Sequence, residues 1–221
     1  MLFNSLSYGL FLPIVLVLYW FVKYKRVRSQ NILLLFASYF FYGLWDWRFL
    51  LLILASSLID FFAGLEISKS GNPKRKKLFL YSSIIWNFGV LFIFKYYNFF
   101  INEFTVLFNL NSNDYTFNSL QIILPIGLSF YTFQSMSYSI DVYRGNAKAI
   151  RNFIDFSCYV SMFPQLVAGP IIRFQEIAGQ LISRTHTMEK FSRGLMFFFL
   201  GMGKKVLLAN PCGKIADLAF D

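Results

Sequence analysis

The residues best suited to handle a polar substrate lie together in one apolar stretch, FIDFSCYVSMFPQLVAGPIIR, at positions 153–173. Gln165 can both donate and accept hydrogen bonds. Gly169 permits close backbone approach, whereas Pro170 removes a donor and ends a helix, so the pair leaves main-chain groups unpaired. Such groups could line a passage for a polar substrate. A purely structural kink fits the same pattern.

A second set of polar side chains lies in the run LPIGLSFYTFQSMSYSIDVYRG at 124–145. Hydroxyl and amide groups at membrane depth need hydrogen-bond partners, and so they usually face other helices or a cavity. Gln134 is therefore a candidate either for a substrate path or for contact between helices. Asp141 and Arg144 follow at the end of the run, where their spacing allows a local ion pair.

These residues do not form a complete catalytic constellation. The only histidine is His186, in the polar sequence SRTHTMEK, and we expect it to be a solvated surface residue. The sequence contains no metal-ligand spacing, phosphate-binding glycine loop or GxSxG motif, so we predict neither a metal site nor a bound cofactor. Cys158 and Cys212 lie in apolar surroundings, and we expect both to be small buried side chains.

The composition predicts that these residues belong to a membrane protein. Hydrophobic residues make up 57% of the chain and charged residues 14%, whereas about a quarter of the residues in soluble domains are charged. The apolar residues come in blocks of roughly 17 to 24, the length that crosses ~30 Å of hydrocarbon. We therefore predict an all-α polytopic protein with about six transmembrane helices, at approximately 5–22, 31–45, 49–66, 78–97, 120–140 and 194–210.

The distribution of Lys and Arg predicts the orientation. The net charge is +10, but the positive residues gather in alternate short loops, which favours the positive-inside pattern over nucleic-acid binding. We predict that these basic loops are cytoplasmic and that the N-terminus is outside. The loops at 45–48 and 98–119 contain only one base, Arg48. The basic loops are 23–30, 67–77, 141–152 and 173–193.

This alternation holds only if the segment at about 153–172 enters and leaves the membrane on the same side. Bases flank it at Arg151 and Arg173, which also favours a re-entrant segment. Broken helix at membrane depth is tolerated only where protein or a water-filled cavity surrounds it. The next segment, about 173–193, is amphipathic. It could lie along the cytoplasmic interface or dock on the bundle as a connector helix.

Three motifs follow one another along the second half of the chain: PIGLSFYTFQSMSYSIDVYRG (125–145), SMFPQLVAGPIIRF (161–174) and GLMFFFLGMGKKVLLAN (194–210). In order and spacing they resemble the membrane-bound O-acyltransferase family, most closely its bacterial alginate O-acetyltransferase-like branch. The turn YGLWDWRF at 42–49 also resembles that branch. The resemblance covers essentially the whole chain.

The resemblance implies a ring of helices around a tunnel that links the cytoplasm to the outer face of a bacterial inner membrane. It implies an acyl donor on the cytoplasmic side, acetyl-CoA or an acyl carrier protein. The acceptor would be a hydroxyl of an extracytoplasmic polysaccharide, such as alginate or peptidoglycan, or a partner acetyltransferase. The FPQLVAGP segment resembles the tunnel wall. With the polar candidates above, the predicted substrate path comprises Gln134, Asp141, Arg144, Phe163, Pro164, Gln165, Gly169, Pro170 and Arg173.

The chain departs from the family in one respect. The family's catalytic histidine lies in a later helix, in a context that His186 does not share, so we expect it beyond Asp221. We interpret residues 1–221 as the N-terminal portion of a single membrane-embedded transferase domain and expect this portion alone to be inactive. A membrane transporter or flippase is the alternative function, because broken helices and polar groups at the midplane occur there too. A membrane scaffold that recruits partners through its basic loops is a third.

Overall fold

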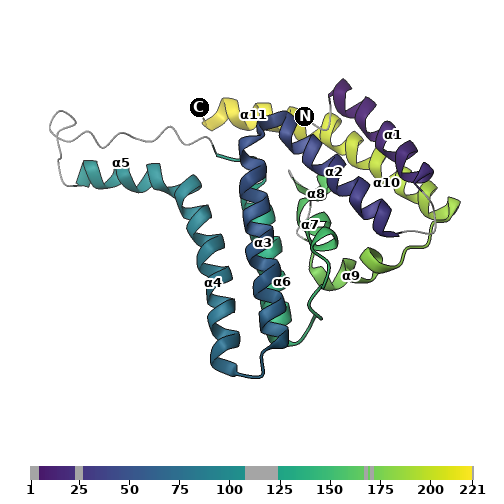
Figure 1. The fold of residues 1–221 in the computed structure, drawn as a ribbon. Helices are drawn as coiled ribbons and strands as arrows, with labels where there is room; N and C mark the ends of the chain where they lie inside the picture. Colours follow the sequence, from purple (N-terminus) through teal and green to yellow (C-terminus); the bar gives the residue numbers. More distant parts are fainter. Residues whose placement is uncertain (1–4, 23–26, 108–123, 167–168, 170–171, 221) are drawn as a thin grey trace.

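The computed structural model describes residues 5–22, 27–107, 124–166, 169 and 172–220. Over these ranges the chain forms helices and no strand (Figure 1). The helices are α1 (Leu6–Phe21), α2 (Val27–Asp46), α3 (Arg48–Lys69), α4 (Pro73–Leu91), α5 (Tyr97–Leu107), α6 (Leu128–Arg144), α7 (Phe153–Ser161), α8 (Phe163–Leu166), α9 (Phe174–Ile182), α10 (Met188–Lys204) and α11 (Asn210–Phe220). Two π-helical turns, η1 (Phe92–Tyr96) and η2 (Lys205–Ala209), join α4 to α5 and α10 to α11.

Helices α3, α4 and α6 pack together in the centre of the protein, and α2, α7 and α9 pack beside them. Local signals set the ends of these helices. Asn72 caps α4 through its side chain, with Pro73 in the first helical position, where a missing N–H costs nothing. Gly127 and Gly145 flank α6 with φ angles of 78° and 77°, a backbone conformation that favours glycine.

The predicted all-α membrane architecture is confirmed. Among the described residues, three helices are long and apolar enough to cross a bilayer, namely Arg48–Lys69, Pro73–Ile101 and Met188–Phe220. Leu6–Phe21 is apolar but shorter. The count of six spans stays a prediction, because these criteria do not test it. Part of the predicted span at 120–140 also lies outside the described residues.

Three boundaries differ from the expectation. The predicted polar loop at 98–119 begins instead as helix α5, which continues to Leu107 and turns away from α4 after η1 (Figure 1). The predicted amphipathic segment at 173–193 divides into α9, a linker and the start of α10. The last helix continues through η2 to Phe220, and the π-helical turn η2 directly precedes Asn210 and Pro211. Irregular helical turns are common next to a proline, which cannot donate a main-chain hydrogen bond.

The two cysteines have different surroundings. Cys158 is buried in α7 as expected, whereas Cys212 is exposed. The expectation for Cys212 was wrong because α11 has no buried residue and packs on none of the central helices. An apolar local sequence did not predict burial here.

Candidate functional site

The site is built around the break between α7 and α8, which lies against α2. Asn31, one turn into α2, donates from Nδ2 to Oδ1 of Asp155 at 2.6 Å and to the carbonyl of Leu181 at 2.9 Å. The start of α7 and the end of α9 therefore meet at one side chain. Further along α2, Oγ of Ser38 accepts a hydrogen bond from the main-chain N–H of Phe163 at 3.0 Å.

These contacts trace the path of the segment. Asn31 and Ser38 are about 10 Å apart along a helix that rises 1.5 Å per residue, so α7 runs along α2 between them. With nine residues, α7 is about 14 Å long, half the hydrocarbon thickness. After α8, the carbonyl of Ile172 accepts a hydrogen bond from the Tyr159 hydroxyl at 3.0 Å. The chain beyond the break therefore lies beside α7 again.

Two predicted site residues converge on a single carbonyl at the break. Gln134 of α6 and Gln165 of α8 are both buried, and their Nε2 atoms donate to the carbonyl oxygen of Tyr159 at 2.8 and 2.9 Å. In a continuous helix this carbonyl would accept the N–H of Phe163, which here bonds to Ser38 instead. The two amides thus satisfy a carbonyl that the break leaves without its helical partner.

Gly169 lies against the backbone of Gln165. Its N–H donates to the Gln165 carbonyl at 3.0 Å. A Cβ atom at this position would lie 2.4 Å from the Gln165 Cα, far inside any normal contact. The close backbone approach predicted for Gly169 is therefore present. Pro170, the other half of the predicted pair, lies outside the described residues.

The remaining candidates occupy different environments. Phe163 is buried, and its ring contacts Phe11 with centroids 5.2 Å apart, whereas Pro164 is exposed. Asp141 is buried near the end of α6, and its Oδ2 has no hydrogen-bond partner. Arg144 and Arg173 are exposed.

The ion pair considered for Asp141 and Arg144 does not form. The ion pairs between described residues are Arg48 with Asp46 and Arg75 with Glu66. The carbonyl of Asp141 instead accepts main-chain N–H groups from Asn146 and Ala147, because the chain turns sharply at Gly145. The structure therefore brings Gln134, Gln165 and Gly169 together and leaves the two arginines outside this group.

Sequence reasoning missed the residues that hold the break in place. Asn31 and Tyr159 donate hydrogen bonds from their side chains to other segments, and Ser38 accepts one from Phe163. Only Asn31 gave a signal in the sequence, as an amide at the start of an apolar block. Asp60, an acid inside α3, is fully buried and bonds within the bundle. Its Oδ1 accepts from Ser83 Oγ at 2.5 Å and from Asn87 Nδ2 at 3.0 Å, so α3 and α4 share a buried polar contact.

The expectation of a solvated His186 was wrong. Its side chain is half-buried against the rings of Tyr19 and Trp20, and its Nε2 shares a hydrogen bond with the Tyr19 hydroxyl at 2.7 Å. Arg184 donates to the same hydroxyl at 3.2 Å and also to Oδ1 of Asn31. This polar chain ties the end of α1 to the linker before α10. Burial and the charges of Arg184 and Lys190 hold the pKa of His186 below its usual 6.5.

We therefore expect the imidazole of His186 to titrate below pH 6.5 in the folded chain. Between the folded pKa and 6.5, the imidazole is protonated in the unfolded chain but neutral in the folded chain. The contribution of His186 to stability is therefore present above pH 6.5 and is lost as the pH falls through this range. NMR of ¹³C-labelled histidine measures the pKa directly, since the chain contains one histidine. Lys190→Gln should raise the value. A pKa at or above 6.5 in the unsubstituted chain would contradict the expectation.

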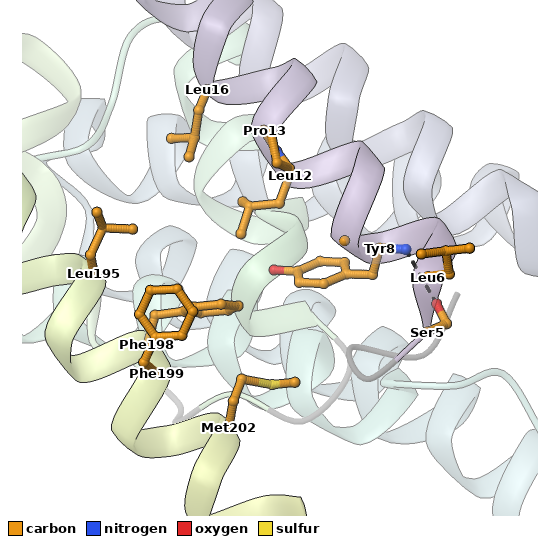
Figure 2. Close-up of a pocket in the computed structure, with 11 residues that line it drawn as sticks. Ser5, Leu6, Tyr8, Leu12, Pro13, Leu16, Leu195, Phe198, Phe199 and Met202 are labelled. Carbon is orange, nitrogen blue, oxygen red and sulfur yellow. Dashed lines mark hydrogen bonds between the residues drawn. The ribbon is translucent and has the colours of Figure 1, made fainter.

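An apolar groove of about 570 Å³ lies between α1 and α10 (Figure 2). Figure 2 shows Tyr8 of α1 and Phe198 of α10 among the side chains that line it. Ser5 accepts a hydrogen bond from the N–H of Tyr8 and so caps α1. None of the described residues that line the groove is charged, and we assign no chemistry to it. Among the described residues, no three His, Cys, Asp or Glu side chains cluster as metal ligands would.

The chain is similar to known proteins over almost its whole length. Over 96% of this chain it is 40% identical to a probable alginate O-acetylase AlgI of Pseudomonas syringae pv. tomato and 41% identical to the protein of that name in Pseudomonas aeruginosa. It is 29% identical, over all of its length, to a peptidoglycan O-acetyltransferase of Helicobacter pylori. No family model matches the chain, and no solved structure matches it.

These alignments confirm the likeness to alginate O-acetylases that the three motifs predicted. The chain spans 40% of the length of each of the two alginate O-acetylases and 47% of the length of the peptidoglycan O-acetyltransferase.

Proposed function

We propose that this chain is the N-terminal portion of a membrane O-acetyltransferase, which moves an acetyl group from a thioester donor to a hydroxyl of an extracytoplasmic polysaccharide. The observation that carries the proposal is the similarity to O-acetylases over 96% of the chain. Because the relatives named above are acetyltransferases, the similarity favours acetyl transfer over transport or flipping of a substrate.

In this reaction the acceptor hydroxyl loses its proton to a general base, its oxygen attacks the thioester carbonyl, and the carbon–sulfur bond breaks to release a thiol. The resemblance assigns the base to a histidine beyond Asp221. The donor we propose is acetyl-CoA or an acyl carrier protein. In this chain, the pair Gln134 and Gln165 would position the wall of the substrate path, since their amides hold the carbonyl at the break.

Helices α10 and α11 support the interpretation as one portion of a larger domain. No residue in the most apolar part of Met188–Phe220 is buried within the described chain. This part contains Lys204 and Lys205, which are costly to expose to lipid. Lysines within an apolar membrane helix usually face protein or a water-filled cavity. We propose that the part of the relatives that this chain does not span packs against this face.

We also propose that 153–172 is re-entrant, with the basic loops cytoplasmic and the N-terminus outside a bacterial inner membrane. Two contacts support this: the Tyr159 hydroxyl bonds to the Ile172 carbonyl, and Asn31 bonds to both Asp155 and Leu181, so the chain beyond the break returns along α7 to the level of α2 where α7 begins. The arrangement of turns also supports it. The basic turn between α3 and α4 and the end of α6 lie at one end of the bundle, and the turn between α2 and α3 lies at the other (Figure 1).

The test is the acetyl ester content of the cell's extracytoplasmic polysaccharides, measured as acetate released by alkali. We expect it to fall when the gene is deleted and to return with the intact protein. Gln165→Ala should restore about a tenth or less, since a buried carbonyl loses one of its donors and the path shifts. Gln180→Ala, which removes an exposed amide from α9, should restore it fully.

Membrane levels of the variants must be equal for this comparison. Full acetylation with Gln165→Ala at equal levels would exclude the positioning role. Unchanged acetylation in the deletion strain would refute the proposed function itself.

A further inference from the structure

A groove with a volume of about 620 Å³ lies between the segment 146–152 and α9, apart from the break. Its floor is apolar. Ile150, Phe174 and Ala178 line it, and all three belong to or pack against the main hydrophobic core. Ile182, at the end of α9, also lines the groove and is 77% exposed. The apolar floor therefore continues to an exposed apolar side chain.

The rim of the groove is basic. Lys148 and Arg151 line it, both are exposed, and neither takes part in the ion pairs formed among the described residues. One carboxyl group, that of Asp155, also lines the groove, but it accepts a hydrogen bond from Asn31 at 2.6 Å. A ligand here would meet two unpaired cations beside an apolar surface. This combination suits an amphiphile with an anionic head.

The groove does not suit the acetyl donor, because it does not reach the candidate path. Gln134, Gln165 and Gly169 are absent from its lining, and core side chains close its floor. A thioester seated in it would lie apart from the break. A membrane lipid needs no such passage. Basic pockets beside transmembrane helices on the cytoplasmic side are typical sites for anionic lipid head groups.

We infer that this groove binds an anionic phospholipid of the cytoplasmic leaflet, with its phosphate at Lys148 and Arg151 and an acyl chain along Ile150 and Ile182. The leaflet rests on the orientation proposed above, whereas the binding itself does not depend on acetyl transfer. A bound lipid would join the segment before α7 to α9 and so brace the two ends of the broken segment. This surface is separate from the apolar groove between α1 and α10.

The experiment measures binding of phosphatidylglycerol and phosphatidylcholine to the intact protein, purified in detergent, by native mass spectrometry. We expect the unsubstituted protein to bind phosphatidylglycerol preferentially. The double variant Lys148→Gln/Arg151→Gln should bind it roughly ten- to thirtyfold more weakly, in line with the contribution of two bases. Lys74→Gln/Lys77→Gln, which removes two exposed bases near the start of α4, should bind as the unsubstituted protein does.

A second variant tests the apolar half without changing charge. Gly179 of α9 lines the groove, and a Cβ there would meet nothing within 4 Å, so Gly179→Leu should fold normally and block phosphatidylglycerol. Equal binding of the two lipids, or unchanged binding by the double variant, would overturn the inference. Displacement of phosphatidylglycerol by millimolar coenzyme A would also overturn it, and would assign the groove to a phosphorylated donor. Acetylation assays play no part, so failure here leaves the proposed function standing.

Discussion

Replacing Gly169 with alanine in the intact protein is expected to lower acetyl transfer about a hundredfold while leaving membrane insertion unchanged. The added Cβ would lie 2.4 Å from Cα and 2.7 Å from Cβ of Gln165. No rotamer change relieves a contact with the backbone, and so the chain must move. Displacement of a positioned group by about 1 Å is enough for a loss of that size. Acetate released from the polysaccharide, normalised to the amount of protein in the membrane, measures it.

Gly89→Ala is the matched control. It makes the same chemical change within α4, where an added Cβ meets nothing within 4 Å. Alanine also favours a helix over glycine by about 1 kcal/mol. We expect full activity from this variant. Equal activity of the two variants would show that the approach of Gly169 to Gln165 does not matter to the path, and would remove Gly169 from the candidate site.

Replacing Asp60 with alanine is expected to destabilise the helical bundle by about 2 to 4 kcal/mol, the largest stability effect we foresee for a single side chain. Asp60 is fully buried, and the change removes the charged acceptor that the hydroxyl of Ser83 and the amide of Asn87 share. Ser139 lies 3.0 Å from Ser83, so α6 shares the contact. Equilibrium unfolding of the purified protein in mixed micelles measures the free energy.

Asp60→Asn should cost less, about 1 kcal/mol, because its remaining Oδ1 can accept from both Ser83 and Asn87. Asp46→Ala, at the end of α2, should leave the free energy of unfolding nearly unchanged, since surface ion pairs contribute little. If Ser83→Ala and Asp60→Ala had additive effects, the two side chains would not act together, and the network would not be the source of the loss.

Much of the architecture could be predicted from the sequence because it depends on local properties. The length and apolarity of the blocks predicted membrane helices, and the predicted span at 31–45 lies within α2. The bases at 67–77 predicted the turn between α3 and α4, where Asn72 and Pro73 begin the next helix. Hydrogen bonds within a helix satisfy its own backbone, so these elements need no information from distant residues.

The candidate site could be predicted only in part. The sequence marked Gln134, Gln165 and Gly169 as polar or conformationally unusual residues in apolar surroundings, and the structure brings them together. It did not indicate that both amides would donate to one carbonyl. Nor did it indicate the half-buried position of His186, which depends on Tyr19 and Trp20, more than 160 residues away in the chain.

By itself, the sequence determined that this protein is a helical membrane protein related to O-acetylases. It also determined where most of the helices run and which polar residues need hydrogen-bond partners within the membrane. The tertiary structure decided which partners those residues find. The carbonyl of Tyr159 needs outside donors only because Ser38, on another helix, takes the N–H of Phe163. An unpaired polar group is a local property that composition reveals. Its partner is set by the packing of helices distant in sequence, and only the folded chain brings the two together.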